Sequence, residues 1–170
     1  LVNVVRAFDS PASPHPLGGI DPVRDAETLE LEMVIADLAV VEKRQGKIEQ
    51  EMKRKKGAEA AKLEVEKDLL ERFNQHLSSE KALREIELTE EEEKLIKGYT
   101  FLSLKPVMIL VNISESDIGE SPEFIEKIDA WAKERNMPVL KFCGKAEMEI
   151  AQLDESERPE FMEALGIEES

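Results

Sequence analysis

The chain has 170 residues, of which 38 are acidic and 23 basic, and its formal net charge is −15. This length can bury the core of one or two domains, and the negative charge argues against general affinity for nucleic acid or specificity for DNA, although a local basic cluster can still contact RNA. The single cysteine excludes an intramolecular disulfide, and no apolar run approaches the ~20 residues of a membrane span.

The first predicted element is a strand over residues 1–8, which are rich in β-branched side chains. The chain begins inside this strand and without an initiator Met, so we interpret the sequence as an internal segment of a longer protein. Residues 9–24 carry four of the eight prolines and the Gly18-Gly19 pair, which predict an irregular loop.

A long helical hairpin is predicted next, over about residues 25–78. Asp21 and Pro22 have the residue types of a helix cap and a first helical position. Side chains spaced three and four apart then form a heptad seam with one polar interruption: Leu31, Val34, Leu38, Val41, Gln45, Ile48 and Met52. The returning helix has Leu63, Leu70, Phe73 and Leu77 on one face. These two faces predict an antiparallel coiled coil.

The tip of this hairpin is basic. We expect Lys53, Arg54, Lys55 and Lys56 in the last turn of the first helix, where they complement the helix dipole, with Gly57 ending the helix. The same four charges could instead contact RNA or a ribosomal surface.

Strands and helices alternate in the second half of the chain. Thr89 and Glu92 form a capping box, which predicts a short helix ending at Gly98. The expected elements after it are a strand at 106–111, a helix from Ser121 to Asn136 that buries Phe124, Ile125, Ile128 and Trp131, a strand at 138–142 and helices at 145–153 and 156–165. This order predicts a parallel α/β sheet with the hairpin inserted into it.

The Pro-led strand at 106–111 is followed by Asn112 and, three residues later, Glu115. Ligand-binding loops of open α/β sheets lie at the carboxyl ends of strands, where the Asn112 amide would face a nucleobase edge. Guanine-specific GTPases have Asn-Lys-x-Asp at such a point, and their Asp accepts hydrogen bonds from guanine. Adenine has an acceptor at N1, so Asn-x-x-Glu indicates relaxed or adenine-directed choice. Alternatively, Asn112 only caps a turn.

Several motifs together resemble the Obg-like ATPase family, also called YchF, across essentially the whole chain. They are the 2–8 strand, the His15 loop ending in Ile20-Asp21-Pro22-Val23-Arg24-Asp25, the Asn-x-x-Glu loop and Phe142-Cys143-Gly144-Lys145-Ala146-Glu147. The resemblance implies a partial P-loop NTPase fold, which is G-domain-like, with a parallel sheet and an inserted coiled-coil hairpin. It also implies a cytoplasmic, ribosome-associated ATPase for the intact protein.

The resemblance divides the chain into three parts. Residues 1–24 would be a strand and loop of the nucleotide domain, residues 25–98 the coiled-coil insertion with its return segment, and residues 99–170 the second half of the nucleotide domain. Two loops of that last part would read the base, Asn112, Ile113 and Glu115 in the first and Cys143, Gly144 and Lys145 in the second.

The resemblance also implies a role for particular groups in these loops. The Asn112 amide would face the N6/N7 edge of adenine, Ile113 would pack on the ring, and the Gly144 N–H would approach the base. Cys143 replaces the Ser of the corresponding GTPase loop, and it is otherwise interpreted as a small buried hydrophobe rather than a reactive thiol.

No Gly-x-x-x-x-Gly-Lys-[Ser/Thr] motif occurs in the chain, so ATP phosphates and Mg²⁺ would be held by other segments of the intact protein. No catalytic residue is assigned; His15 and His76 lack partners at metal-ligand spacing, and the role of His15 stays open. Two alternatives are an Obg-type GTPase with a degenerate guanine loop and a non-enzymatic coiled-coil adaptor.

Overall fold

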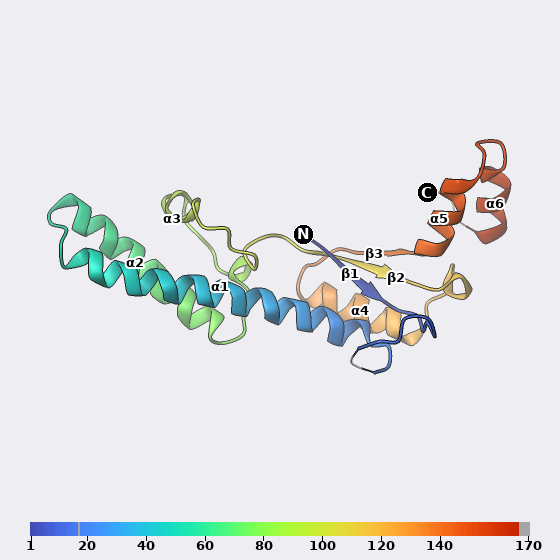
Figure 1. The fold of residues 1–170 in the computed structure, drawn as a ribbon, viewed down its shortest axis with the longest axis horizontal. Helices are drawn as coiled ribbons and strands as arrows, with labels where there is room; N and C mark the ends of the chain where they lie inside the picture. The colour runs from blue at the N-terminus through green and yellow to red at the C-terminus, as the bar shows by residue number, and fades with distance from the viewer. Residues whose placement is uncertain (17, 167–170) are drawn as a thin grey trace. The chain divides into compact units, whose positions relative to one another are not determined.

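A computed structural model describes residues 1–16 and 18–166 of the chain (Figure 1). The chain divides into two compact units. We call Leu1–Glu27 with Val107–Ser170 the sheet unit and Thr28–Pro106 the hairpin unit. None of the helices in the described residues is both long and apolar enough to cross a membrane.

The described part of the sheet unit contains a three-stranded parallel sheet in the order β1-β2-β3. Its strands are β1 (Val2–Arg6), β2 (Met108–Asn112) and β3 (Val139–Phe142). The predicted α/β class with a parallel sheet is therefore confirmed. The second strand begins two residues later than predicted and ends one residue later, on Asn112. It includes Asn112 because the Asn112 carbonyl still accepts a ladder hydrogen bond from the Ala7 N–H at 2.8 Å.

Helix α4 (Glu123–Glu134) covers one face of this sheet (Figure 1). Its buried side chains are Ile125, Ile128, Trp131 and Ala132, while the predicted core residue Phe124 is only half-buried. The helix is capped by Pro122, one residue after the predicted Ser121. The Trp131 indole N–H donates to Glu27 Oε1 at 2.9 Å, which joins α4 to the first turns of α1.

The opposite face of the sheet is apolar and exposed. Val4, Leu110 and Leu140 share one row across the three strands. Val4 is 58% exposed and Leu140 55% exposed. After β3 come α5 (Gly144–Gln152) and α6 (Arg158–Leu165), as predicted, and the left-handed Gly166 ends α6.

The hairpin consists of α1 (Pro22–Met52), which begins in the sheet unit, and α2 (Ala58–Leu77). Asp21 Oδ1 accepts from the Arg24 N–H at 3.1 Å, which confirms the predicted helix start. The expected position of the basic tip was wrong, because α1 ends at Met52 and residues 53–56 form the turn after it. Gly57, with φ of 66°, precedes α2 rather than ending α1, since the left-handed region suits a turn glycine.

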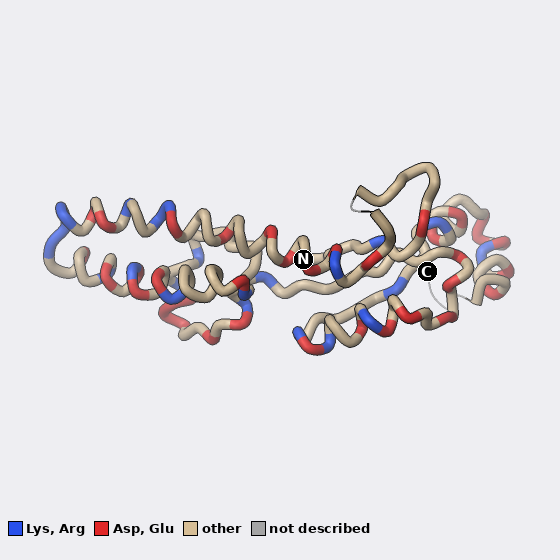
Figure 2. The backbone as a smooth tube through the Cα atoms, turned by 90° about the horizontal axis from the view of Figure 1, so that it is seen from below, with Lys and Arg blue, Asp and Glu red and all other residues tan. Residues whose placement is uncertain are grey.

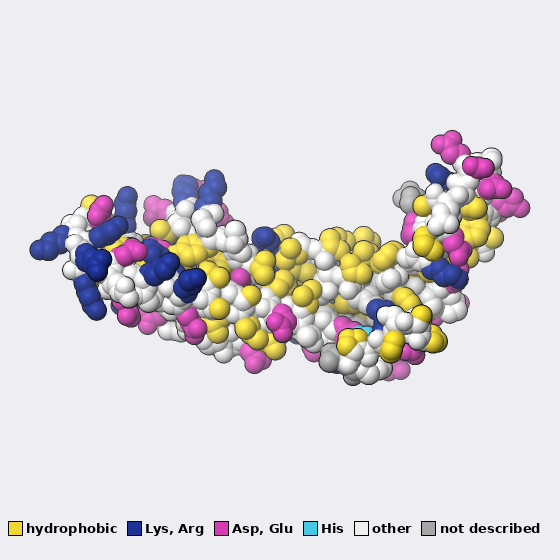
Figure 3. Space-filling model, in the orientation of Figure 1, with side chains coloured by type: hydrophobic (Ala, Val, Ile, Leu, Met, Phe, Trp, Pro, Cys, Tyr) yellow, Lys and Arg dark blue, Asp and Glu magenta, His cyan; other side chains and the backbone are white. Residues whose placement is uncertain are grey.

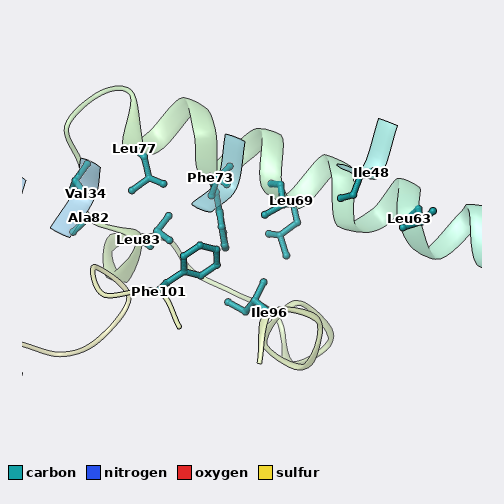
Figure 4. Close-up of a cluster of buried hydrophobic side chains, with 12 residues drawn as sticks. Val34, Ile48, Leu63, Leu69, Phe73, Leu77, Ala82, Leu83, Ile96 and Phe101 are labelled. Atoms are coloured by element: carbon teal, nitrogen blue, oxygen red, sulfur yellow. The ribbon is translucent and has the colours of Figure 1, made fainter. Parts of the chain in front are cut away.

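The core of the hairpin unit lies along the predicted seam (Figure 4). Its buried residues are Val34, Val41 and Ile48 from α1, Leu63, Leu69, Leu70, Phe73 and Leu77 from α2, and Ala82, Leu83, Ile96 and Phe101 from the return segment. Leu31 is 39% exposed, so the buried seam starts later than predicted. Gln45, the polar residue that interrupts the seam, has a polar partner on the returning helix: Asn74 Nδ2 donates a hydrogen bond to Gln45 Oε1 at 3.2 Å.

The return segment contains η1 (Leu83–Glu85) and α3 (Glu90–Ile96), and α3 has the predicted Thr89–Glu92 capping box. A buried carboxylate fixes the end of this segment. Asp37 accepts hydrogen bonds from the Leu102 N–H, the Ser103 N–H and the Ser103 hydroxyl at 2.8, 2.7 and 2.6 Å. These bonds tie residues far along the chain to α1.

Candidate functional site

The two loops singled out by the sequence follow neighbouring strands. Asn112 ends β2 directly beside Phe142, which ends β3. After β2 the chain forms the short helix η2 (Glu115–Asp117). After β3 only Cys143 precedes the start of α5 at Gly144. The Ile113 N–H donates to the Phe142 carbonyl at 2.9 Å, so the ladder continues one residue past the strands. The loops thus leave the sheet side by side, at the edge where α/β proteins bind ligands.

A hydrogen bond joins the two loops where they leave the sheet. The Gly144 N–H donates to Asn112 Oδ1 at 3.0 Å. Both groups were expected to bind a nucleobase, whereas in the structure they form a hydrogen bond with each other. The Asn112 amide nitrogen makes no hydrogen bond to any residue within 1–16 and 18–166. The acceptor of the Asn112 side chain is therefore occupied within the protein, and its amide N–H groups are not.

Gly144 is packed closely against its neighbours. A Cβ built at this position would lie 3.3 Å from Asn112 Oδ1 and 3.4 Å from both Asn112 Nδ2 and the Phe142 ring. The contact with Asn112 Oδ1 is tighter than an ordinary van der Waals contact, so a side chain at 144 would require the Asn112 amide to shift by a few tenths of an ångström. The missing side chain at 144 therefore leaves room for the amide in its present position.

An ion pair joins the same two loops further out. Lys145 Nζ lies 2.5 Å from Glu115 Oε2, and a second carboxylate, Glu149 Oε1, lies 3.8 Å from the ammonium. The pair is open to solvent, with side-chain exposures of 61% for Lys145 and 36% for Glu115. The hydrogen bond to Glu115, and then its charge, raise the pKa of Lys145 above its ordinary value. The Lys145 ammonium is accordingly charged near neutral pH.

The two remaining predicted residues are mostly inside the protein. Ile113 is 7% exposed and Cys143 is 6% exposed. Burial agrees with the interpretation of Cys143 as a small hydrophobe. Only a small part of the Ile113 side chain is left exposed to a ligand.

His15 lies in a cluster that the sequence did not assign. Its Nε2 is 2.7 Å from Asp25 Oδ2, and Arg24 Nη2 is 3.0 Å from the other oxygen of the same carboxylate. All three residues belong to the loop before α1 and its first turn. Within the described residues, no group of three or more His, Cys, Asp or Glu side chains could hold a metal ion.

The basic hairpin tip is a separate surface. All four side chains of residues 53–56 are exposed, and Lys and Arg gather at this end of the hairpin in the tube and space-filling views (Figures 2 and 3). Acidic side chains cover much of the α5–α6 region (Figure 3). The chain therefore has a local positive patch at the hairpin tip although its net charge is negative.

Two contacts of the site were missed by the sequence analysis, namely the Asn112–Gly144 hydrogen bond and the Lys145–Glu115 ion pair. Each joins residues about 30 positions apart. The signal that could have found the ion pair was the placement of opposite charges at equivalent points, just after two adjacent parallel strands; the hydrogen bond has no such signal. That signal becomes useful only once the strand order is known.

The parallel sheet, the paired loops at its carboxyl edge and the inserted hairpin are features of one segment of a P-loop NTPase of the Obg-like kind. No family model matches the chain. Curated relatives do match: the ribosome-binding ATPase YchF of Bacillus subtilis is 37% identical over 172 residues, which cover 100% of this chain and 46% of the relative. The Haemophilus influenzae protein of that name is 35% identical over 98% of this chain and 45% of its own length.

Obg-like ATPase 1 of Caenorhabditis elegans is 30% identical over 98% of this chain and 42% of its own length. The solved structure of the Schizosaccharomyces pombe YchF GTPase has a TM-score of 0.84 and 27% identity, and the match covers 98% of this chain and 45% of that one. The chain belongs to the Obg-like ATPase (YchF) family and spans somewhat less than half the length of these relatives. The predicted family and fold are confirmed.

Proposed function

We propose that this chain supplies the base-reading half of a cytoplasmic ATPase, and that the whole protein binds and hydrolyses ATP. The observation that carries the proposal is the Gly144–Asn112 hydrogen bond, which joins the two loops through the amide oxygen and leaves the amide N–H groups of Asn112 to donate to a base. Support comes from relatives that are named ribosome-binding ATPases and match the full length of this chain.

The chemistry of the site follows from these groups. The Asn112 amide nitrogen donates to N7 of a purine, and the missing side chain at Gly144 lets the ring approach the backbone. The acidic and imidazole groups of the described residues do not form a metal site. Phosphate binding and hydrolysis are therefore assigned to other parts of the whole protein, and the chain contributes the orientation of the base.

Removal of the Asn112 amide tests this assignment. In the whole protein, Asn112→Ala should weaken ATP binding by about tenfold, because one hydrogen bond of roughly 1.4 kcal/mol corresponds to one decade of affinity. Gln152→Ala is the control, since it removes an exposed amide from α5 of the same unit. Equal Kd values for ATP in wild type and Asn112→Ala, measured by calorimetric titration, would refute base reading by these loops.

A second expectation concerns the isolated 170-residue chain. It should show no ATP turnover, because the backbone amides of a Gly-rich phosphate loop are absent from its sequence. The rate of phosphate release should not increase in proportion to the concentration of the chain as it is purified. Turnover that scales with the concentration of the pure chain would contradict this division of labour.

The GTPase alternative has a specific observation in its favour. With its oxygen occupied by Gly144, the Asn112 amide reads N7, which adenine and guanine share. The S. pombe relative is also named a GTPase. Titration of the whole protein with ATP and GTP decides between them, and we expect tighter binding of ATP.

We propose the ribosome, through its RNA, as the partner of the hairpin tip. Its support is the exposure of all four basic side chains in the turn, together with the names of the relatives. Replacing Lys53, Arg54, Lys55 and Lys56 by Gln should weaken ribosome binding and reduce its dependence on salt concentration, since fewer phosphate charges are neutralised. Replacing the exposed Lys127 and Lys133 of α4 by Gln is the control; an unchanged salt slope in the tip variant would refute the proposal.

A further inference from the structure

The hydrogen bond between Gly144 and Asn112 leaves a question of specificity. A donor-only amide at purine N7 cannot separate adenine from guanine, because both bases have an acceptor there. The two bases differ at the next positions of the ring: guanine has N–H donors at N1 and at its exocyclic amine, and adenine has an acceptor at N1. A free carboxylate near these positions favours guanine, and the first loop contains one in Glu115.

The structure shows this carboxylate already engaged. Glu115 Oε2 is 2.5 Å from Lys145 Nζ, and the two residues come from the two loops that border the base. The N1–H and the exocyclic amine of guanine together bind both oxygens of a carboxylate, so guanine could make this paired contact with Glu115 only by displacing the lysine from Oε2. Adenine has no donor at N1 or C2 and does not compete for the carboxylate at these two positions.

We propose that Lys145 is a specificity-determining residue, which holds the Glu115 carboxylate in an ion pair across the loops and so withholds it from guanine. This inference rests on the proposed function, in which the two loops bind the base. It assigns the disfavouring of GTP to a charge pair, not to the shape of the pocket.

A role of this kind suits an exposed pair. Ion pairs as open as Lys145–Glu115 contribute little to the stability of a fold, so the pair is not needed to hold the loops together. The Gly144–Asn112 hydrogen bond already joins the two loops where they leave the sheet. The Lys145 ammonium would also attract the phosphates of a nucleotide, but ATP and GTP carry the same triphosphate. Any such attraction cancels in the ratio of their affinities.

The test is the ratio of the Kd values for GTP and ATP in the whole protein, measured by calorimetric titration. Lys145→Met releases the carboxylate and should shift this ratio toward GTP by about tenfold, the value of one charge-assisted hydrogen bond. Lys145→Arg preserves the ion pair and should leave the ratio unchanged. Lys127→Met is the matched control, because Lys127 forms a comparable exposed pair with Glu123 at 2.7 Å on α4.

A double variant identifies the group that is released. Adding Glu115→Gln to Lys145→Met removes the free carboxylate and should return the ratio to the wild-type value. The inference is overturned if Lys145→Met leaves the ratio unchanged, or if the shift persists in the double variant. Asn112→Ala separates this failure from that of the proposed function. If Asn112→Ala weakens both nucleotides, the loops bind the base and only the role of Lys145 is lost; if it weakens neither, the base is not read by these loops.

Discussion

The hairpin unit and the sheet unit use side chains in opposite ways. In the hairpin unit, α1, α2 and the return segment enclose a common core, in which Ile48, Leu70, Phe73, Leu77 and Leu83 are almost fully buried. In the sheet unit, one face of the sheet is covered by α4, and Val2, Val4 and Leu140 on the other face are more than half exposed. The polar groups of the candidate site lie at the edge of this half-covered sheet.

This difference separates stability from binding. Side chains of the hairpin are held by burial, which is lost when a large residue is cut back. The site loops are held by single polar contacts, whose net contributions to folding are small. Substitutions in the hairpin should therefore lower the free energy of unfolding, and substitutions in the loops should change ligand affinity instead.

The largest effect is expected for Phe73→Ala. Phe73 is fully buried, and its ring packs edge-on against Phe101 with 5.7 Å between centroids. Loss of this side chain should reduce the free energy of unfolding by about 3–5 kcal/mol. Val65→Ala on the exposed side of the same helix should stay within about 0.5 kcal/mol. Similar shifts of the two denaturant midpoints would show that α2 does not bury the face that carries Phe73.

A smaller but substantial loss is expected for Asp37→Ala. This carboxylate is 2% exposed and accepts three hydrogen bonds from Leu102 and Ser103. Its removal leaves buried donors without partners, which should cost about 2–4 kcal/mol of unfolding free energy. Glu42→Ala, an exposed change on the same helix, is the control. A loss below about 1 kcal/mol would mean that water or another group replaces the carboxylate.

The third prediction concerns pH. Burial, together with the Glu66 carboxylate that accepts from the Tyr99 hydroxyl, raises the pKa of Tyr99 from 10.0 to about 12. Because this folded-state pKa exceeds the unfolded one, the stabilisation is complete below about pH 10 and is lost as the pH rises through 12. From pH 9 to 11, wild type should lose about 1 kcal/mol more unfolding free energy than Tyr99→Phe. Parallel pH curves for the two proteins would contradict the raised pKa.

The smallest effect on folding is expected in the site. Gly144→Ala places a methyl group 3.3 Å from Asn112 Oδ1, which a small movement of the amide can relieve. The unfolding free energy should change by less than about 1 kcal/mol, while ATP affinity of the whole protein falls by about tenfold. Gly98→Ala is the control, because a Cβ there meets no atom within 4 Å. A large loss of stability without loss of affinity would reverse the comparison between the two units.

Most elements of the fold were predictable because their signals are local. The β-branched run at Val2–Arg6, the cap at Asp21 and the capping box at Thr89 each act within a few residues, and each is found in the structure. The predicted position of the basic tip was wrong because it, too, was inferred from a local signal. The sequence shows where positive charge suits a helix end, but not that the backbone leaves the helix at Met52 to form the turn.

The sequence alone determined the family, the alternation of strands and helices, and the apolar faces that close the hairpin, since periodicity and short motifs carry this information directly. Only the tertiary structure decided which polar groups satisfy one another. Asp37 accepts a hydrogen bond from Ser103, Asn112 accepts one from Gly144, and Glu115 forms an ion pair with Lys145. The partners are 66, 32 and 30 positions apart in the chain. Such pairs form because strand order and helix packing bring distant residues together, and no local pattern specifies a hydrogen bond over that separation.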